Sequence, residues 1–381
     1  MYNVNWNLNL GEKTMKYLFV DGNNLGCRSS FVHKSLSINL IDYTQDFNPD
    51  SIGSSKGEFP TGATHGFLRT IAAIRRDYPD RYVVVVWDGK SKARIEEAKA
   101  AMEKGIVPSG YKSNRPENER VPEVAAFHQQ KPVIMEALSM TNIPQIVKKD
   151  EEADDVIASF VTAMPDDDIM VLTGDKDFYQ LFRHQMTILE SGGNILTEAW
   201  FRQAYGISPA QWVDVGALMG DDGDAIHGIP FWGEKTATRE IVQHGTCEAV
   251  LSALHAEFDP LRVQYPDVCG DEFNMLKELK TPKGKLKFPH LKPWMPFTGV
   301  ALACENGAIK MPRSSVMALV YESRVALAKS LKGMHRNIKL PNLPVDLERD
   351  KVAEFKEICS KYGLREVSAS AELICSKQVH S

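Results

Sequence analysis

The sequence predicts an α/β protein with a parallel central sheet that is flanked by helices. Three short apolar runs rich in β-branched residues, at 16–20, 82–87 and 168–173, are typical of strands buried on both faces. Helical patterns separate these runs, so strands and helices alternate along the chain as they do in βαβ units. The chain has 381 residues, enough for two or three domains of about 150 residues each.

The helices of this fold are expected where the helical patterns lie, over 64–76, about 123–139 and 153–164. After residue 225 the pattern is mainly helical, and a last strand-and-helix pattern covers 337–367. The expected organisation is a flexible extension at 1–14, a core at 15–222 with an insertion at about 90–135, a helical lobe at 223–367 and a loose tail at 368–381.

Composition excludes several classes of protein. Apolar residues make up 43% of the chain and charged residues 25%, which is ordinary for a globular protein and excludes disordered and collagen-like chains. The apolar runs are too short to span a bilayer, so we expect no membrane partner. The six cysteines form no Cys-x-x-Cys pair, which argues against zinc knuckles and disulfides and favours reduced thiols in a cytoplasmic protein.

Each predicted strand ends in or near an acid: Asp21, Asp88 and Asp175. Functional sites of open α/β sheets form beyond these ends, because the carboxyl ends of parallel strands lie at one edge of the sheet. A single Asp in this position is more often a turn residue or a helix cap. Three of them, together with acidic groups elsewhere in the chain, favour a functional site.

Nine acids from five separated segments form a candidate metal site. They are Asp21, Asp88, Glu152, Asp154, Asp155, Asp175, Asp177, Asp221 and Asp224. Acids in a first helical turn also favour the helix dipole, but capping needs only one or two of them. Such a cluster would repel itself unless cations lay within it. Oxygen ligands without cysteine or a histidine pair suit Mg²⁺ or Mn²⁺, and two such ions about 4 Å apart can stabilise a phosphodiester displacement.

The distribution of charge makes a nucleic-acid partner compatible with an acidic protein. The net charge of −5 argues at first against binding to polyanions. Without the nine acids the formal charge is +4, so the rest of the chain is mildly basic. Basic residues gather in the insertion, including Arg94, Lys112 and Arg115, although a solvated helix face remains an alternative for them. The Lys-rich segment 281–293 is interpreted as an exposed linker more readily than as a further duplex contact.

The ordered motifs resemble those of the 5′-nuclease family, which includes flap endonucleases, bacteriophage 5′–3′ exonucleases and the 5′-nuclease domain of bacterial DNA polymerase I. The motifs are DGNNL at 21–25, WDGK at 87–90, YKSNR at 111–115, EADD at 152–155, TGDKDFYQL at 173–181 and GDDGDAIHGIPFWGEKTA at 220–237. The resemblance covers about residues 16–367. It implies a PIN-like 5′-nuclease fold with a helical arch in the insertion and a duplex-binding helical lobe, in a stand-alone nuclease of a bacterial or phage-infected cytosol.

The resemblance also implies roles for individual residues. The first metal cluster would be Asp21, Asp88, Glu152, Asp154 and Asp155, and the second Asp175, Asp177, Asp221 and Asp224. The implied cofactor is Mg²⁺, two ions or more, with Mn²⁺ as a substitute. The implied catalytic residues are Asp175, near both ions, and Arg94 and Lys112, which would place positive charge beside the transition state.

The residues implied to contact DNA are Tyr111, Arg115, Gly228, Gly233, Lys235 and Thr236. Tyr111 would either stack on an unpaired base or pack within the arch. Segment 228–237 resembles the helix–turn–helix that grips the duplex, where backbone N–H groups face a phosphate and carbonyls could hold K⁺. The usual second glycine of that turn is replaced in the stretch Ile229-Pro230-Phe231-Trp232-Gly233, and its bulky residues argue against the K⁺ site. The rings of Phe231 and Trp232 are expected to pack under the turn instead.

The implied function is a Mg²⁺-dependent, structure-selective 5′ nuclease that acts as a monomer. Its partners would be branched, flapped or 5′-ended DNA and RNA–DNA duplex, recognised by backbone and shape. One alternative is a non-catalytic protein that binds branched DNA. The other is a single-strand ribonuclease of the PIN type, against which the long insertion and the 220–237 turn argue.

Overall fold

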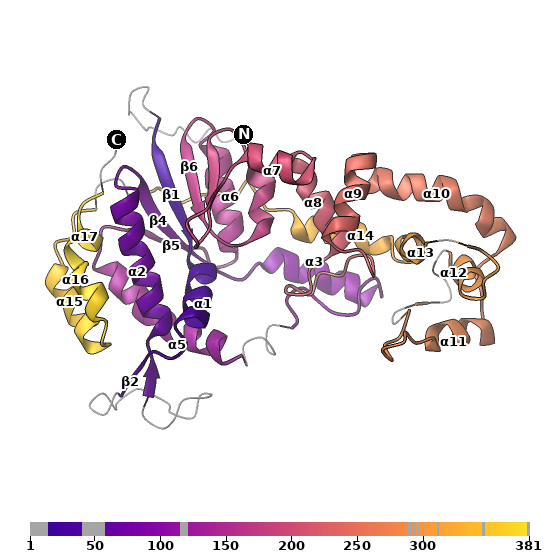
Figure 1. Cartoon of the computed structure of the whole chain (residues 1–381), viewed down its shortest axis with the longest axis horizontal. Coiled ribbons are helices and arrows are strands. Elements are labelled where there is room, and N and C mark those ends of the chain that lie inside the picture. The colour runs from indigo at the N-terminus through magenta and orange to yellow at the C-terminus, as the bar shows by residue number, and fades with distance from the viewer. Residues whose placement is uncertain are drawn as a thin grey trace.

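The computed structural model describes residues 14–39, 58–114, 121–288, 291–292, 295, 297–310, 312–344 and 347–378. Its centre is a six-stranded sheet with the strand order β5-β4-β1-β6-β7-β8 (Figure 1). The strands are β1 (Lys16–Asp21), β4 (Tyr82–Trp87), β5 (Gln145–Val147), β6 (Asp168–Leu172), β7 (Met186–Leu189) and β8 (Ile195–Leu196). The extension expected at 1–14, apart from Thr14, and Arg115 lie outside the described residues.

The three predicted strands form the centre of the sheet and run parallel, which confirms the predicted fold class. β4 is also parallel to β5 and β6 to β7, whereas β8 is antiparallel to β7, so one edge of the sheet is mixed. On β1 the side chains alternate: Leu18 and Val20 join one hydrophobic cluster, and Tyr17 and Phe19 join the other. Both faces are therefore covered, as buried parallel strands require.

Helices cover the two faces of the sheet. The helices nearest to it are α1 (Gly22–Val32), α2 (Gly62–Asp77), α5 (Pro122–Ser139) and α6 (Ala153–Ala163). α1, α2 and α5 pack together on one face, while buried apolar residues of α6 belong to the cluster on the other. A small antiparallel pair, β2 (Ser37–Asn39) and β3 (Glu58–Pro60), contacts α5 through β3.

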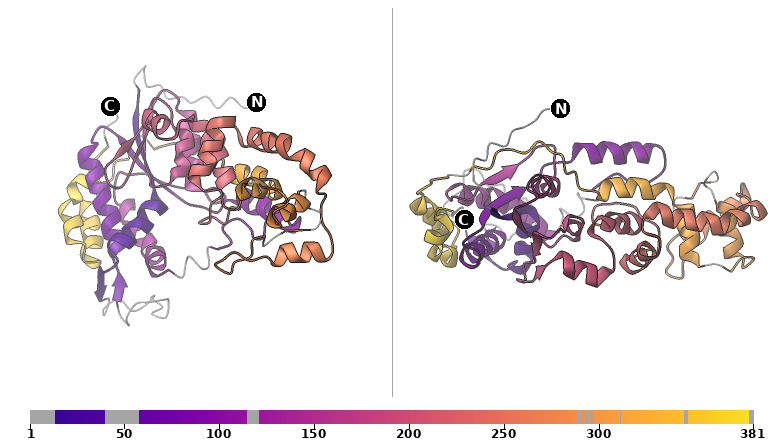
Figure 2. Two further views of the ribbon diagram at one scale, coloured as in Figure 1. Left: turned by 45° about the vertical axis from the view of Figure 1, so that its right-hand side comes forward. Right: turned by 90° about the horizontal axis from the view of Figure 1, so that it is seen from above.

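A run of helices extends away from the sheet (Figures 1 and 2). They are α7 (Glu198–Tyr205), α8 (Trp212–Met219), α9 (Glu234–His244), α10 (Cys247–Gln264), α11 (Asp271–Glu278), α12 (Thr298–Glu305), α13 (Arg313–Val320) and α14 (Ser323–Lys332), preceded by the 3₁₀ helix η1 (Lys176–Leu181) and interrupted by η2 (Pro209–Gln211). α8 packs against α9 and α14, and it also contacts η1, which follows β6 and so connects the extension to the sheet. No helix of the described ranges is long and apolar enough to cross a bilayer.

The insertion expected at about 90–135 is more closely integrated into the fold than the sequence suggested. Its first helix, α3 (Lys92–Glu103), packs against α14 and buries Ala98 and Ala101. Its other end belongs to α5, where Phe127 and Ile134 are fully buried in the cluster under the sheet. The apolar residues of α5 therefore draw this helix into the core, and the part left between the helices is shorter than predicted.

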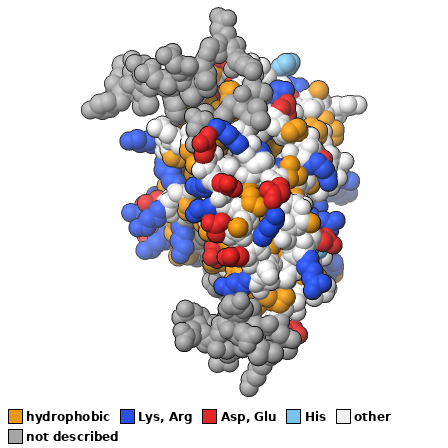
Figure 3. All heavy atoms as spheres, turned by 90° about the vertical axis from the view of Figure 1, so that its left-hand side faces the viewer, with side chains coloured by type: hydrophobic (Ala, Val, Ile, Leu, Met, Phe, Trp, Pro, Cys, Tyr) orange, Lys and Arg blue, Asp and Glu red, His pale blue; other side chains and the backbone are white. Residues whose placement is uncertain are grey.

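The loose tail expected at 368–381 is wrong for residues up to 378. Helices α15 (Val352–Lys361), α16 (Arg365–Ala369) and α17 (Ala371–Cys375) return to the sheet, and the last two pack against α2. Ile374 and Cys375 are buried there, which explains why this end is ordered. The described part of 337–351 contains no strand, unlike the expected pattern. Lys, Arg, Asp and Glu side chains are mixed on this outer face, as on a solvated surface (Figure 3).

Gln378 completes the part of β4 that β5 leaves unpaired. The backbone N–H of Val83 donates to Oε1 of Gln378 (2.6 Å), and Nε2 of Gln378 donates to the carbonyls of Val83 (3.0 Å) and Asn142 (2.9 Å). β5 pairs with β4 only from Val85 onward. The Gln378 amide thus replaces a strand partner for Val83, since a buried backbone group needs a hydrogen bond.

We expect Gln378→Ala to lower the free energy of unfolding by about 1–3 kcal/mol, because it leaves buried groups of Val83 without partners. The control is Lys377→Ala, which removes an exposed ion pair with Glu348 and should change stability by less than about 0.5 kcal/mol. Urea unfolding of both variants measures the difference. Equal midpoints for the two variants would show that Gln378 does not support β4.

Candidate metal centre

Two predicted ligands lie at the ends of neighbouring parallel strands. Asp21 is the last residue of β1, and its carboxylate accepts a hydrogen bond from the N–H of Asn24 (3.0 Å), which caps α1. Asp175 follows β6 and accepts from the N–H of Asp177 (2.8 Å), which caps η1. Asp21 and Asp175 thus cap the N-termini of the helices that follow them. They also lie at the edge of the sheet where the carboxyl ends of the parallel strands meet.

Asp88, after β4, is held by two groups. It accepts from the side-chain amide of Asn23 (2.8 Å) and from the N–H of Ala153 (3.0 Å), the first residue of α6. Asn23 in turn accepts from Nζ of Lys131 (2.9 Å). The sequence analysis missed Asn23 and Lys131 as supports of the site, although Asn23 lies within the DGNNL motif and was the available signal.

Five of the nine predicted acids line one pocket of about 540 Å³. They are Asp21, Asp88, Asp154, Asp175 and Asp224. Asn23, Asn24, Arg28, Lys112 and His128 line the same pocket. The structure thereby brings together carboxylates from five places in the chain, as the sequence led us to expect for a metal site.

The pocket concentrates negative charge out of water. Burial, and then the charges of Asp88 and Asp175, raise the pKa of Asp21 to about 7. Burial, followed by Asp21 and Asp175, raises the pKa of Asp154 well above its usual range. These carboxylates repel one another when ionised, and a divalent cation would remove that repulsion. Carboxylate oxygens are the ligands that Mg²⁺ and Mn²⁺ prefer, so the residues present fit such an ion.

Glu152 and Asp155, by contrast, are bound to protein cations. Arg94 donates to Asp155 through two nitrogens (2.6 and 2.7 Å) and to Glu152 (2.8 Å). Asp155 is fully buried, and Arg94 is only 3% exposed. Arg94, expected beside the reacting phosphate, therefore lies inside the protein and holds the start of α6. Its short bidentate pair with Asp155 is of the strong, charge-assisted kind.

Lys112 lies between this buried group and the pocket. Its Nζ is 2.6 Å from Oε1 of Glu152 and 3.6 Å from Oδ2 of Asp224. Its backbone has a positive φ of 53°, and its N–H donates to the carbonyl of Asp224 (2.8 Å). Tyr111 is buried and donates to Glu152 (2.8 Å). Of the two roles open to Tyr111, the structure shows packing and not an exposed stacking surface.

Asp177 and Asp221 form a third group around Lys332. The Nζ of Lys332 lies 2.5 Å from Asp177 and 2.9 Å from Asp221. Burial alone would raise the pKa of Asp221, but the positive charge of Lys332 lowers it overall. Burial and the charge of Asp175 raise the pKa of Asp177 to about 7. The sequence analysis missed Lys332. No motif marks this residue, which is 111 positions from Asp221.

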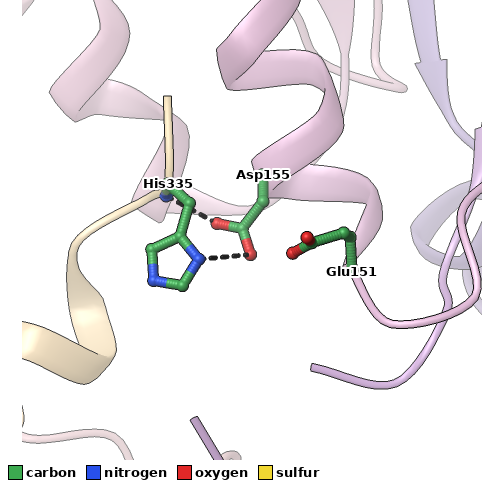
Figure 4. Close-up of side chains that lie close together, drawn as sticks. All are labelled: Glu151, Asp155 and His335. Carbon is green, nitrogen blue, oxygen red and sulfur yellow. Dashed lines mark hydrogen bonds and ion pairs between the residues drawn. The ribbon is translucent and has the colours of Figure 1, made fainter. Parts of the chain in front are cut away.

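Figure 4 shows a further group formed by Glu151, Asp155 and His335, whose nearest ligand atoms lie within 4.8 Å of one another. The N–H of His335 donates to Oδ1 of Asp155 (2.8 Å), and its Nδ1 is 3.9 Å from Oδ2. Both oxygens of Asp155 also accept from Arg94. Because Asp155 is already neutralised, we interpret this group as an anchor for the chain after α14 and not as a metal site.

The turn at 228–237 leads into α9. A Cβ at Gly228 would lie 2.4 Å from the backbone nitrogen of Gly220, so this position needs glycine for close packing of the chain. Trp232 is buried under the turn and donates to the carbonyl of Ser314 (2.8 Å), as expected, but Phe231 is 56% exposed, and the expectation for its ring is wrong.

The residues of this turn that were predicted to contact DNA are placed at the start of α9. Gly233 precedes the helix, and no atom lies within 4 Å of where its Cβ would stand. Lys235 is exposed in the first turn, and Thr236 beside it is half-buried. An open glycine and an exposed lysine at a helix N-terminus suit a phosphate, and contact with DNA stays a prediction.

Comparisons with known proteins match the chain to nucleases. A family described as "5'-3' exonuclease, N-terminal resolvase-like domain" matches residues 16–206. The chain is 32% identical over 249 residues to the thermostable DNA polymerase I of Thermus thermophilus, which covers 65% of this chain but only 26% of the polymerase. This chain thus spans about a quarter of the length of the polymerases that it matches.

Other relatives are matched over most of their length. A 5′–3′ exonuclease of Halalkalibacterium halodurans is 30% identical over 273 residues, 69% of this chain and 82% of that protein. The structure of the catalytic core of Rad2 in complex with DNA substrate superposes with a TM-score of 0.50 at 14% identity, covering 94% of this chain and 92% of the other. The bacteriophage T5 D15 protein crystallised with metal ions gives 0.49 at 16% identity, with 94% and 98% covered.

The family match takes in β1 to α7, including Asp21, Asp88, Asp154 and Asp175. On the extent of this match and the identity to a whole exonuclease, the chain belongs to the 5′–3′ exonuclease family.

Proposed function

We propose that the chain is a metal-dependent 5′ nuclease that hydrolyses phosphodiesters of DNA, and of RNA paired with DNA, at flaps, branches and 5′ ends. The observation that carries this proposal is the pocket in which five carboxylates from separate segments meet Lys112 and Arg28. Acids alone repel a polyanion, whereas acids that hold divalent cations attract one. Membership of the exonuclease family points to the same chemistry.

Mg²⁺ is the ion that we propose, with Mn²⁺ as a substitute. The residues that would hold it are Asp21, Asp88, Asp154, Asp175 and Asp224. When bound, divalent ions supply positive charge that stabilises the transition state of phosphodiester hydrolysis. This assignment does not include Glu152 and Asp155, because Arg94 and Lys112 already neutralise them.

The basic residues would divide the work of binding and positioning. Lys112 and the exposed Arg28 line the pocket and would bind the scissile phosphate. Arg94 would be a positioning residue, since it fixes the start of α6 and thereby Asp154. Lys235 at the start of α9 would bind a phosphate of the duplex. These contacts recognise the backbone and shape of the substrate, so we expect cleavage to depend little on base sequence. We also propose that the protein acts as a monomer in the cytoplasm.

Asp175→Asn should reduce cleavage of a 5′-flap duplex by at least about 100-fold, because it removes a charge at the centre of the metal site. The flap is labelled separately at its 5′ and 3′ ends and incubated with Mg²⁺ or with a chelator. Asp222→Asn is the matched control: this exposed acid lies in the same turn as Asp221 but does not line the pocket. The control should cut like the wild type.

The same assay separates the rival functions. Release of the 5′ label near the junction, only with metal, supports a 5′ nuclease, and the product lengths divide endonuclease from exonuclease action. Tight binding of the flap without cleavage in any metal would indicate a branch-binding protein. Cleavage of single-stranded RNA in preference to the flap would indicate the PIN-type ribonuclease.

Lys112→Ala should lower cleavage of all flap sequences by a similar factor of about 10 or more, since a phosphate contact carries no base information. Lys104→Ala, an exposed lysine of the same segment, should have little effect. Rates on a set of flaps with different sequences at the cut measure both. A loss confined to some sequences would contradict recognition by backbone and shape.

The contribution of Asp21 and Asp177 to the stability of the metal-free protein should fall as pH rises from about 4 to about 7. Burial and neighbouring carboxylates raise the pKa of Asp21 and of Asp177 from 3.8 to about 7, so the folded chain binds more protons than the unfolded chain in this range. Mg²⁺ would replace the proton of Asp21 and should therefore raise the melting temperature more at about pH 8 than at about pH 5.5. Thermal unfolding with Mg²⁺ and with a chelator at both pH values measures this difference. Asp21→Asn should reduce it, and an equal Mg²⁺ effect at both pH values would contradict the electrostatic account.

A further inference from the structure

Lys332 is the last residue of α14, and its ammonium group lies between two predicted metal ligands. Its Nζ is 2.5 Å from Oδ2 of Asp177 and 2.9 Å from Oδ2 of Asp221. The Lys332 side chain is only 5% exposed, unlike an ordinary surface lysine. An ion pair this shielded from water is much stronger than a surface pair, and it is costly to separate.

The surrounding structure holds Lys332 in this position. A Cβ at Gly216 of α8 would lie 3.2 to 3.5 Å from carbons of the Lys332 side chain, so the glycine leaves room for that stem. Gln180 donates to the carbonyl of Lys332 (3.1 Å) and accepts from the N–H of Met334 (3.0 Å), which fixes the backbone where α14 ends. Packing against α8 and these two hydrogen bonds aim the ammonium at the acids.

Asp224 of the pocket lies 3.6 Å from Nζ of Lys112, but three other acids of the pocket have no such partner among the described residues. Among the described residues, no Lys or Arg forms an ion pair within 4.0 Å of Asp21, Asp154 or Asp175. In the described part of the chain, Asp177 and Asp221 therefore have a resident lysine, whereas Asp21, Asp154 and Asp175 have none within 4.0 Å. The two halves of the acidic site differ in how much they gain from an added metal ion.

We propose that Lys332 is a built-in cation for Asp177 and Asp221, so that the protein binds one divalent ion tightly and a second only weakly. The tight ion would be held by the pocket acids Asp21, Asp88, Asp154, Asp175 and Asp224, and the second would have to displace the Lys332 ammonium. This proposal rests on the metal-dependent function proposed above. Lys332 thereby determines how many ions the site holds at a given metal concentration.

The test is binding of Mn²⁺ to the whole protein, followed by the electron paramagnetic resonance of free Mn²⁺ and by calorimetry. The wild type should bind one ion tightly and a second weakly. Lys332→Met keeps the apolar stem and removes the charge, so it should tighten the second ion by about tenfold or more, because a unit charge a few ångströms away opposes binding of a cation.

Lys329→Met is the matched control. Lys329 lies one turn earlier on α14 and pairs with Asp214 (2.7 Å) and Glu248 (2.8 Å), which do not line the pocket. This variant should bind Mn²⁺ like the wild type. Lys332→Arg keeps the positive charge and should also keep the second ion weak.

Thermal unfolding in chelator shows whether each variant is folded. Lys332→Met should be less stable than the wild type without metal, because two shielded carboxylates lose their partner, and Mn²⁺ should raise its melting temperature by more. If it does not fold without metal, Lys332→Gln provides the comparison with Lys332→Arg: the neutral Lys332→Gln should tighten the second ion and the charged Lys332→Arg should not.

Equal affinities for the second ion in the wild type and Lys332→Met would overturn the proposal and leave the nuclease function standing. Equal tightening in Lys332→Arg and Lys332→Met would also overturn it, since the effect would then come from packing and not from charge. Binding of no Mn²⁺ by the folded wild type would instead overturn the metal-dependent function itself.

Discussion

The repulsion between carboxylates gathered at one edge of a parallel sheet is the constraint on which the rest of this structure depends. β1, β4 and β6 are neighbours, and each brings an acid to the same edge. Burial and the neighbouring carboxylates raise the pKa of Asp21 to about 7. Without cations, the folded chain therefore holds a proton on Asp21 at a pH at which a solvent-exposed carboxyl group would have lost it. This concentration of negative charge explains why cationic side chains lie beside the other acids of the site.

Arginine and lysine side chains neutralise some of the acids, and the remaining acids are available to a metal ion. The segment directly after α14 joins the two neutralised groups. Lys332 pairs with Asp177 and Asp221. The carbonyl of the next residue, Gly333, accepts a hydrogen bond from Arg94 (2.9 Å), and the N–H of His335 donates to Asp155. The packing of the extended helices therefore places this segment at the site. Among the described residues, the pocket acids without a lysine or arginine within 4.0 Å are Asp21, Asp154 and Asp175.

The fold was predictable where the signal is local. Buried strands of the parallel type carry short continuous apolar runs, and the three runs found in the sequence are the three central strands. The position of α5 and of the C-terminal helices was misjudged, because their place depends on partners far away in the chain. Phe127 is buried beneath the sheet, and Gln378 bonds to Val83, 295 residues earlier. No local pattern reveals contacts of that range, since burial depends on which surfaces meet after folding.

The sequence by itself determined the chemistry that is available: acids at strand ends, their order along the chain, and hence a site at the carboxyl edge that suits hard divalent cations. Only the tertiary structure decided which acids remain open to an ion. Asp154 and Asp155 are adjacent in sequence, yet Asp154 lines the pocket and Asp155 is bound to Arg94. Neighbours on a helix point in different directions, and the cation that each one meets comes from an element that folding brings to it.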